Sequence, residues 1–375
     1  MLNKAIITNR TNPQIRLNTI CPYFTMFPLS FPYKVLLSAQ KDDLVYDPFC
    51  GRGTTNYAAR LLGIESYGVD SNPVAHAIAQ AKFVKVNSKE IVIRCKYILQ
   101  NFQTYTIPKG DFWKWAYHHT TLDSICKLRD YFLSSPNLDN IDIALRAIIL
   151  GALHGPKMKL QQSYLSNQMP RTFATKPDYS ISYWKKHKMK PQEVNLIELI
   201  TRKSTYIFND QLPLKTDGKA VLGDSRTLKR IINRKFNWVI TSPPYYGMST
   251  YEQDQWLRNW FLGGSDKVDY SSNSQVKHWS EKVFIQDLSS VWSNAAEKCS
   301  PNAKLVIRFG ALPSRSEKTP TKLIKESLKL SDCGWKINTI KSAGEPIPSN
   351  RQAVQFKGTT GNYIEEIDIY ASLNT

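Results

Sequence analysis

The stretch Asp47-Pro48-Phe49-Cys50-Gly51-Arg52-Gly53-Thr54-Thr55 decides which fold this chain can adopt. A short apolar segment typical of a buried strand, Leu44 to Phe49, leads into it, and a segment with helical spacing of apolar residues, Thr54 to Leu62, follows it. Two glycines at the join permit positive φ angles and a close approach of the backbone to a ligand. Doubly wound α/β sheets bind ligands at such joins, outside the carboxyl ends of their strands. The stretch therefore predicts an α/β domain with a ligand site at this glycine turn.

The alternation of strand and helix continues downstream of the turn. A second strand at Glu65 to Asp70 and a helix from Pro73 complete a β-α-β-α start. Three more short apolar segments predict strands at Lys219 to Asp224, Asn237 to Thr241 and Ala303 to Arg308. The last two strands have no helical pattern between them, so we expect an antiparallel hairpin at the sheet edge, formed by Trp335 to Ser342 and Tyr363 to Ser372. The expected fold class is α/β with a seven-stranded mixed sheet.

Helical periodicity dominates the region between the two sets of strands. The clearest helical segments there are Leu122 to Leu133, Ile141 to Leu153 and Val194 to Ile207. We therefore predict one domain assembled from residues 1–89 and 216–375, into which residues 90–215 are inserted as a mostly helical region.

The composition is that of a strongly basic globular protein. Of the 375 residues, 42% are hydrophobic, and 50 lysines and arginines outnumber 31 acidic residues to give a formal net charge of +19. Such an excess favours a polyanionic partner, nucleic acid first, over a merely basic surface, because binding releases counterions. No apolar run in the sequence approaches the roughly 20 residues of a membrane span, so we expect a cytoplasmic protein without membrane contact.

The cysteines and histidines do not form a ligand pattern. Six cysteines are scattered along the chain without any Cys-x-x-Cys pair, which argues against a zinc site and against a disulfide framework. The six histidines likewise have no spacing that suggests ligands. We expect no metal ion.

The glycine turn suits a nucleoside better than a dinucleotide. The third glycine of the dinucleotide fingerprint is missing because position 56 is Asn, and this disfavours a pyrophosphate cradle. Asp70 ends the second strand 23 residues after Asp47. At about this separation a carboxylate can accept hydrogen bonds from both ribose hydroxyls of a nucleoside.

Two motifs together resemble the cofactor-binding half of the amino-group DNA methyltransferases: Asp-Pro-Phe-x-Gly-x-Gly-Thr at 47–54 and Gly-Val-Asp-x-Asn-Pro at 68–73. The resemblance implies a Rossmann-like methyltransferase fold with S-adenosylmethionine (AdoMet) as cofactor. It further implies that Asp47 contacts the methionine portion, that the two glycines shape the floor beneath it, and that Asp70 holds the ribose.

Two weaker matches extend the resemblance. Tyr23 to Pro28 resembles the family segment that closes over the methionine end of the cofactor, and Gly223 to Arg226 resembles the acidic strand-end motif near its adenine. The cofactor-binding residues that the resemblance implies are Phe27, Asp47, Pro48, Phe49, Gly51, Gly53, Thr54, Asp70, Ser71, Asp224 and Ser225.

A separate motif, which is not part of the predicted cofactor site, directly follows an apolar strand: Thr241-Ser242-Pro243-Pro244-Tyr245. The two prolines end strand pairing and stiffen the loop. An exocyclic base amine is a poor nucleophile, because its lone pair is delocalised into the ring. Hydrogen bonds from that amine to the Ser242 oxygen and the Pro243 carbonyl would localise the lone pair, and Tyr245 offers a face on which a flipped base can stack. The predicted catalytic residues are therefore Ser242, Pro243, Pro244 and Tyr245.

Several substrates remain open for this loop. Ser-Pro-Pro-Tyr is the form most associated with cytosine N4 methyltransferases, and Asp-Pro-Pro-Tyr with adenine N6 enzymes, so cytosine is favoured over adenine. RNA and protein-glutamine methyltransferases use related Asn-Pro-Pro-Tyr or Asp-Pro-Pro-Tyr loops, and a non-enzymatic basic binding module is a further rival. Methylation at cytosine carbon 5 is disfavoured, because it requires a cysteine after a proline and this chain has none.

The resemblance implies double-stranded DNA as partner, and it leaves open a cognate restriction endonuclease as a second one. In the region 90–215, basic residues alternate with aromatics such as Trp113, Trp115, Tyr117 and Trp184, a pattern that suits phosphate contact and base stacking or, alternatively, a solvated helical face over a small core. The candidate DNA contacts are Lys157, Arg171, Lys185, Lys186, Lys188, Tyr251 and Arg258.

Overall fold

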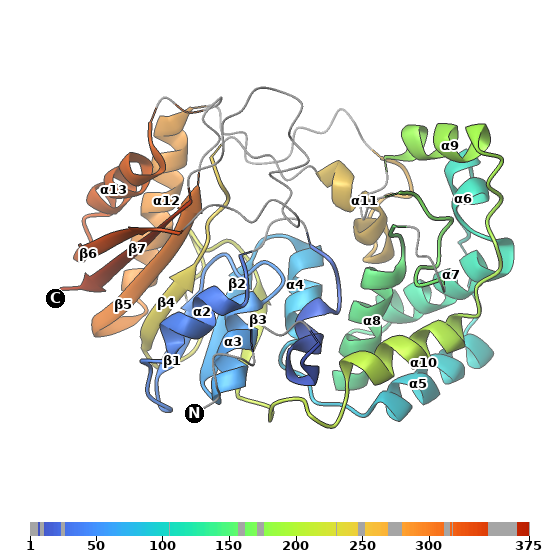
Figure 1. The fold of residues 1–375 in the computed structure, drawn as a ribbon, viewed down its shortest axis with the longest axis horizontal. Coiled ribbons are helices and arrows are strands. Elements are labelled where there is room, and N and C mark those ends of the chain that lie inside the picture. Colours follow the sequence, from blue (N-terminus) through green and yellow to red (C-terminus); the bar gives the residue numbers. More distant parts are fainter. Residues whose placement is uncertain are drawn as a thin grey trace.

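The protein is described by a computed structural model that covers residues 7, 11–23, 27–104, 106–156, 162–170, 176–229, 231–246, 252–268, 280–310, 316, 318–343 and 366–374. A seven-stranded sheet in the order β3-β2-β1-β4-β5-β7-β6 forms one half of the molecule (Figure 1). Its strands are β1 (Leu44–Asp47), β2 (Glu65–Asp70), β3 (Gly218–Leu222), β4 (Phe236–Thr241), β5 (Cys299–Gly310), β6 (Trp335–Ser342) and β7 (Glu366–Leu373). The predicted α/β class and the seven strands are confirmed.

The sheet is mixed in the way that the sequence predicts. The pairs β1–β2, β1–β4, β2–β3 and β4–β5 are parallel, whereas β7 runs antiparallel to both of its neighbours, β5 and β6. The expected β6–β7 pairing is therefore confirmed, with β7 inserted between β5 and β6 so that β6 is the edge strand. Because β1 and β4 are adjacent and parallel, their carboxyl ends bring the glycine turn beside the Pro-Pro loop.

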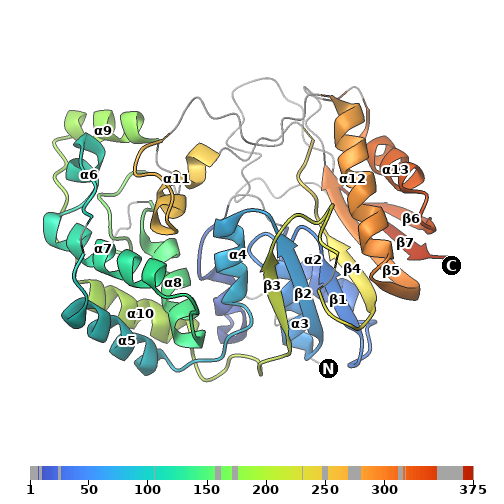
Figure 2. The same cartoon turned by 180° about the vertical axis from the view of Figure 1, so that it is seen from behind.

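Helices cover both faces of the sheet, and alternate side chains of each strand enter different cores. On one face lie α2 (Ser30–Leu36), α3 (Thr54–Leu62) and α4 (Pro73–Gln80); on the other lie α12 (Glu281–Ala296) and α13 (Pro320–Ser331), as Figure 2 shows from behind. In β1, Val45 packs into the first core and Tyr46 into the second. This alternation is the period-2 burial of a strand that is covered on both sides.

The helices next to the glycine turn start and end where local chemistry requires it. Gly53 and Gly63, both with positive φ, flank α3, whose bounds match the predicted Thr54 to Leu62. The side chain of Asn72 accepts hydrogen bonds from the first backbone N–H groups of α4, and Pro73 occupies the first helical position, where a missing N–H costs nothing.

The other half of the molecule is helical (Figure 1). It contains α5 (Ser88–Asn101), α6 (Asp111–Ala116), α7 (His119–Ser134), α8 (Asn140–Ala152), α9 (Pro177–Lys186) and α10 (Leu196–Ile207). The 3-10 helix η1 (Pro13–Thr19) contacts α10 and α3. One hydrophobic cluster joins residues of this region to α3 and α4, so the helical half shares a core with the sheet. The division at residues 90 and 215 stays a prediction.

One helix from outside the predicted insertion also packs on it. This is α11 (Glu252–Phe261), which follows the Pro-Pro loop in sequence but lies beside α8 in both views (Figures 1 and 2). The rings of Trp256 and Trp260 contact Trp113 of α6, at centroid distances of 5.7 and 4.4 Å. The helix that follows the Pro-Pro loop in sequence thus belongs to the helical half.

Candidate functional site

Asp47 lies at the carboxyl end of β1 and is fully buried. Its Oδ1 atom accepts hydrogen bonds from the Phe49 backbone N–H at 3.1 Å and from the Thr241 hydroxyl at 2.6 Å. Its Oδ2 atom is also buried, and it has no hydrogen-bond partner among the residues that the structure describes. Burial raises the pKa of Asp47 to about 6, against the effect of its hydrogen bonds, of which the one from Thr241 lowers the pKa most. A buried carboxylate oxygen without a partner is suited to a donor supplied by a ligand.

The two glycines of the turn have different surroundings. At Gly51, with φ +51°, an added Cβ would meet no atom within 4 Å, so this part of the turn borders open space. At Gly53, with φ +78°, a Cβ would lie 2.9 Å from Lys82 Cγ and 3.2 Å from Ala79. Gly51 thus leaves room for a ligand, whereas Gly53 allows close packing against α4. The role of the two glycines under the cofactor stays a prediction.

Asp70 at the end of β2 is joined to the same turn. Its Oδ2 accepts a hydrogen bond from the Gly51 N–H at 2.8 Å, and its Oδ1 accepts one from the Asn72 N–H at 2.9 Å. Burial raises the pKa of Asp70, while these two backbone donors lower it. Since each carboxylate oxygen can accept a second bond, Asp70 can still bind a pair of hydroxyl groups. The next residue, Ser71, is exposed.

Buried cations fasten the N-terminal segment to the glycine turn. Lys82 Nζ donates to the Leu17 carbonyl at 2.8 Å, and Arg52 donates to the Cys21 carbonyl at 3.2 Å. Burial lowers the pKa of Arg52 to about 10 and that of Lys82 well below its usual value. Because carbonyl oxygens carry only part of a charge, these bonds hold the segment in place at an electrostatic cost.

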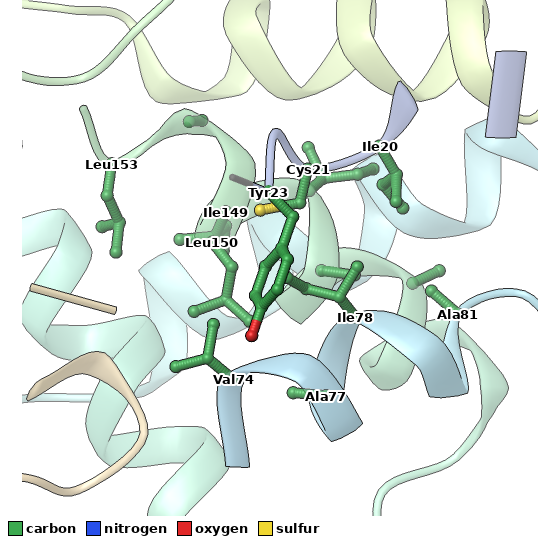
Figure 3. Close-up of a cluster of buried hydrophobic side chains, with 14 of the residues drawn as sticks. Ile20, Cys21, Tyr23, Val74, Ala77, Ile78, Ala81, Ile149, Leu150 and Leu153 are labelled. Carbon is green, nitrogen blue, oxygen red and sulfur yellow. The ribbon is translucent and has the colours of Figure 1, made fainter. Parts of the chain in front are cut away.

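Of the segment Tyr23 to Pro28, which was expected to close over the cofactor, Tyr23, Phe27 and Pro28 are described, and residues 24–26 lie outside the description. Figure 3 shows the ring of Tyr23 among buried side chains that include Val74 and Ile78 of α4 and Leu150 of α8. Its hydroxyl accepts a hydrogen bond from Asn72 at 3.3 Å, which places it next to the Asp70 turn. Burial, and then the charge of Asp70, raise the pKa of Tyr23. Phe27 is half-buried.

The β3 end of the site combines one structural and one charged residue. Ser225 is buried, and its hydroxyl donates to the Pro48 carbonyl at 2.6 Å, which ties this loop to the glycine turn. Asp224 bonds to Arg226, with a shortest distance of 2.6 Å, and Arg226 also bonds to Asp287 at 2.8 Å. The hydrogen bond from Arg226 lowers the pKa of Asp224. An adenine amino group at Asp224 would therefore share this carboxylate with a guanidinium.

The Pro-Pro loop leaves β4 directly beside Asp47. The Thr241 hydroxyl bond to Asp47 links the two predicted motifs, and the Thr55 hydroxyl also reaches β4, donating to the Ile240 carbonyl at 3.4 Å. Beyond Thr241, Ser242 is half-buried, Pro243 is buried and Pro244 is exposed. The structure thus brings the glycine turn and the Pro-Pro loop together.

The next residue, Tyr245, is half-buried, with its ring edge-on to Phe309 at 5.7 Å. Burial raises the pKa of its phenol, the charge of Glu366 raises it further, and hydrogen bonding with Ser242 lowers it. Glu366 is the first residue of β7. Sequence reasoning missed it, because no local motif marks a residue that reaches the site through strand pairing.

Arg308 forms a buried ion pair behind this loop. Its Nε atom donates to Asp368 Oδ1 and its Nη2 atom to Asp368 Oδ2, both at 2.7 Å. Its guanidinium lies 4.0 Å from the centroid of the Phe31 ring. Phe31 in turn contacts Phe27 edge-on at 5.4 Å. The pair therefore connects the last strands of the sheet to the segment near the cofactor turn.

The structure corrects part of the expected DNA interface. Arg258 is buried and bonds to the Leu150 carbonyl at 3.1 Å and to Gln255, so it is not a surface contact for phosphate. Trp113, Tyr117 and Trp184 belong to the core, where their rings cannot stack on bases. The reason is that the small helical half needs large side chains to fill its interior.

Among the other candidates, Lys185, Lys186 and Lys188 are exposed around the end of α9. Lys185 pairs with Asp111 at 2.7 Å, and its ammonium lies 5.9 Å from the Trp115 ring. The remaining three expected contacts lie outside the described residues: Lys157, Arg171 and Tyr251.

Residues 7–81 of the chain match the DNA methylase family of the N6/N4 amino-group type. Over 256 residues the chain is 24% identical to the type II methyltransferase M.BsoBI of Geobacillus stearothermophilus. The matched stretch covers 60% of this chain and 48% of that protein. Both likenesses support an amino-group DNA methyltransferase family for this chain. The chain spans about half the length of the curated relative that it matches.

The likenesses to solved structures are weaker. An rRNA methylase from Streptococcus thermophilus is 6% identical, with a TM-score of 0.34, covering 94% of this chain and 100% of the other. TrmN from Thermus thermophilus is 8% identical, with a TM-score of 0.38, covering 96% of this chain and 53% of the other. Neither likeness adds to the assignment of the family.

The residues that the structure describes contain neither a membrane-spanning helix nor a metal-binding group. None of the described helices is long and apolar enough to cross a membrane. No group of three or more His, Cys, Asp or Glu side chains within the same residues is arranged to hold a metal ion.

Proposed function

We propose that the protein transfers a methyl group from AdoMet to the exocyclic amino group of a flipped base in duplex DNA, with N4 of cytosine as the first candidate. The observation that supports this most directly is the 2.6 Å bond between the Thr241 hydroxyl and the Asp47 carboxylate. It joins the cofactor turn to the Ser-Pro-Pro-Tyr loop, so that a methyl donor and a base amine can meet between them.

The residues of the turn fit AdoMet. The buried, unpartnered Oδ2 of Asp47 would accept a hydrogen bond from the ammonium of the methionine portion. The open side of Gly51 leaves space for the cofactor backbone, and Asp70 would accept the ribose hydroxyls. When bound, AdoMet supplies an electrophilic methyl group on a sulfonium.

The Pro-Pro loop activates the base. Ser242 Oγ and the Pro243 carbonyl accept hydrogen bonds from the two N–H groups of the amine, which localises the nitrogen lone pair. The prolines limit the freedom of the loop, so these acceptors are preorganised. The rigid loop therefore lowers the barrier through acceptors that need no rearrangement during the reaction.

Cytosine is preferred because residue 242 is Ser rather than Asp. Adenine N6 is the second candidate, since its amine presents the same two N–H groups, and an RNA base is the third. We further propose that the helical insertion recognises DNA. The proposed location of the protein is the cytoplasm, and a cognate restriction endonuclease is a proposed partner. The basic excess of the chain supports the choice of nucleic acid over protein as substrate.

Methyl transfer can be tested directly. The protein is incubated with methyl-labelled AdoMet and either PCR-amplified plasmid DNA several kilobases long or bulk RNA, and the nucleic acid is then digested to nucleosides. We expect label in N4-methylcytosine from DNA. Label in N6-methyladenine supports the second candidate, label in RNA alone supports the third, and no label in any of them contradicts the proposal.

A first prediction concerns Asp70. Asp70→Ala should weaken AdoMet binding by about 1.5 to 3 kcal/mol, the range for a lost hydrogen bond to a charged group. Asp70→Asn keeps the shape but loses the charge, so it should fall between the alanine variant and the wild type. Calorimetric titration measures the affinities, with exposed Asp210→Ala as control. Wild-type affinity in Asp70→Ala would remove the ribose assignment.

A second prediction concerns Lys186 and Lys188, which are exposed at the far end of the molecule from α13 (Figure 1). If both contact phosphates, the double change to Gln should reduce the slope of log affinity against log salt by about 2. The matched control replaces Lys325 and Lys329 on α13 by Gln. Fluorescence anisotropy with duplex DNA at several salt concentrations gives the slopes, and an equal change in both double variants would show that α9 is only a solvated face.

A further inference from the structure

The proposed role of Ser242 poses a problem of hydrogen-bond direction. A serine hydroxyl is both a donor and an acceptor. If its own proton points toward the base amine, its oxygen cannot accept from that amine. Efficient activation therefore needs a nearby group that takes the Ser242 proton and leaves the lone pairs free.

Tyr245 is placed to be that group. The rigid Pro243-Pro244 pair separates it from Ser242, and its ring is fixed edge-on against Phe309 of β5 at 5.7 Å. Hydrogen bonding with Ser242 lowers the pKa of the Tyr245 phenol, and hydrogen bonding with Glu366 raises it. A phenol that donates its proton to a carboxylate has its oxygen free to accept from a hydroxyl.

The antiparallel pairing of β5 and β7 brings Glu366 to this point. Glu366 is opposite Gly310, directly after Phe309 along β5, and Asp368 is opposite Arg308. Both carboxylates therefore lie at the same end of the sheet, on residues two apart in β7, whose side chains share one face. The strand register, rather than a local motif, places Glu366 beside the end of β5, the strand against which Tyr245 packs.

Arg308 separates the roles of the two acids. Its two 2.7 Å bonds go to Asp368, and its guanidinium covers Phe31. Such a two-bond pair is the geometry in which guanidinium and carboxylate bind most strongly. Arg308 thus bonds to Asp368, while the charge of Glu366 acts on both Arg308 and the phenol of Tyr245.

We propose that Tyr245 and Glu366 are positioning residues that orient the Ser242 hydroxyl: the Tyr245 oxygen accepts the Ser242 proton, and the Tyr245 proton is donated to the Glu366 carboxylate. The chain of bonds runs from Ser242 through Tyr245 to Glu366. It turns the lone pairs of Ser242 toward the base amine before the substrate arrives, so no reorientation is needed during the reaction. This inference rests on the proposed function.

The test uses single-turnover methyl transfer from labelled AdoMet to the same plasmid DNA. In Glu366→Gln, the amide can donate to the Tyr245 oxygen and compete with the Ser242 proton, so we expect the rate to fall about 10-fold or more, less than for loss of a direct acceptor. Tyr245→Phe keeps the contact with Phe309 and should show a similar loss. AdoMet affinity and melting temperature should stay at wild-type values in both variants.

The decisive measurement is made in a Ser242→Ala background. If Glu366 acts through the Ser242 hydroxyl, adding Glu366→Gln to Ser242→Ala should cause no further loss of rate. The reason is that the effects of substitutions at interacting residues do not add. A purely structural role would lower the rate by the same factor in both backgrounds. The control is Glu326→Gln on α13, which pairs with Lys318 and should react at the wild-type rate.

The outcomes separate the two proposals. If the wild-type protein labels DNA but Glu366→Gln retains the full rate, or if its effect persists unchanged without the Ser242 hydroxyl, the positioning role is overturned and the proposed function stands. If the wild-type protein labels no DNA, the positioning role falls together with the proposed function.

Discussion

Replacing Ser242 by Ala should reduce the turnover of methyl transfer by roughly 10²- to 10³-fold, the effect of deleting one preorganised hydrogen-bond partner of a reacting group. Ser242 is half-buried just beyond β4, and its contribution is to the base amine rather than to AdoMet. The affinity for AdoMet and the melting temperature should therefore remain close to wild type. The rate is measured in single turnovers on plasmid DNA, and the affinity by calorimetry on the same samples.

A surface serine provides the control for this change. Ser38 is exposed after α2, where its hydroxyl donates only to the Val35 carbonyl at 3.1 Å, and Ser38→Ala should react normally. Wild-type turnover in Ser242→Ala would show that the base is activated elsewhere. Loss of AdoMet binding in parallel with activity would show that the Pro-Pro loop is structural.

The parts of the fold that sequence predicts well are those with strong local boundaries. The bounds of α3 agree residue for residue, because glycines with positive φ precede and follow it. The bounds of β2 and β6 agree as well. Strand β5 is longer than predicted, from Cys299 instead of Ala303, because its first residues are partly exposed and lack the apolar pattern.

The partners of an apolar face are harder to predict than the face itself. The aromatic spacing of α11 indicates burial, yet nothing local shows that Trp256 and Trp260 pack on α6 rather than on the sheet. The same limit explains the corrected DNA interface. Trp113 and Trp184 lie next to lysines in sequence. In their helices, α6 and α9, these tryptophans face the core while the neighbouring lysines remain exposed.

Some residues of the candidate site are likewise marked by a local motif, whereas others are placed only by contacts that are distant in sequence. Contiguous motifs could be located from sequence, because Asp47 ends β1 and Ser242 directly follows β4, and ligands bind outside the carboxyl ends of such strands. Glu366 could not, since its place depends on the register of β7 against β5. The packing role of Gly53 also depends on α4, a neighbour that the turn itself does not specify.

The ionised form of the buried Asp47 side chain should lower the free energy of unfolding of the protein without its cofactor. Burial raises its pKa from about 3.8 in the unfolded chain to about 6 in the folded protein, so the folded state holds the proton more tightly. As the pH rises from about 4 to 6, the unfolded chain loses this proton first, and the free energy of unfolding falls. Above about pH 6 the loss is complete, with an upper value of about 3 kcal/mol.

Asp47→Asn should remove this pH dependence. Without cofactor, the stability of the variant relative to wild type should rise by up to about 3 kcal/mol between pH 4 and pH 8, as measured by urea unfolding at both values. Exposed Asp42→Asn is the control and should show no such rise. A constant difference between Asp47→Asn and wild type across this range would mean that Asp47 is not held in a raised-pKa state.

The same substitution should damage cofactor binding. An ionised Asp47 offers its unpartnered Oδ2 to the ammonium of AdoMet, so the affinity of the wild type should increase as the pH rises through about 6. In Asp47→Asn the affinity at pH 8 should be weaker by about 1.5 to 3 kcal/mol, and this increase should disappear. Calorimetric titrations at pH 5 and pH 8 measure both effects. If the variant binds AdoMet as tightly as the wild type, the buried carboxylate has a purely structural role, and the methionine portion is held by another group.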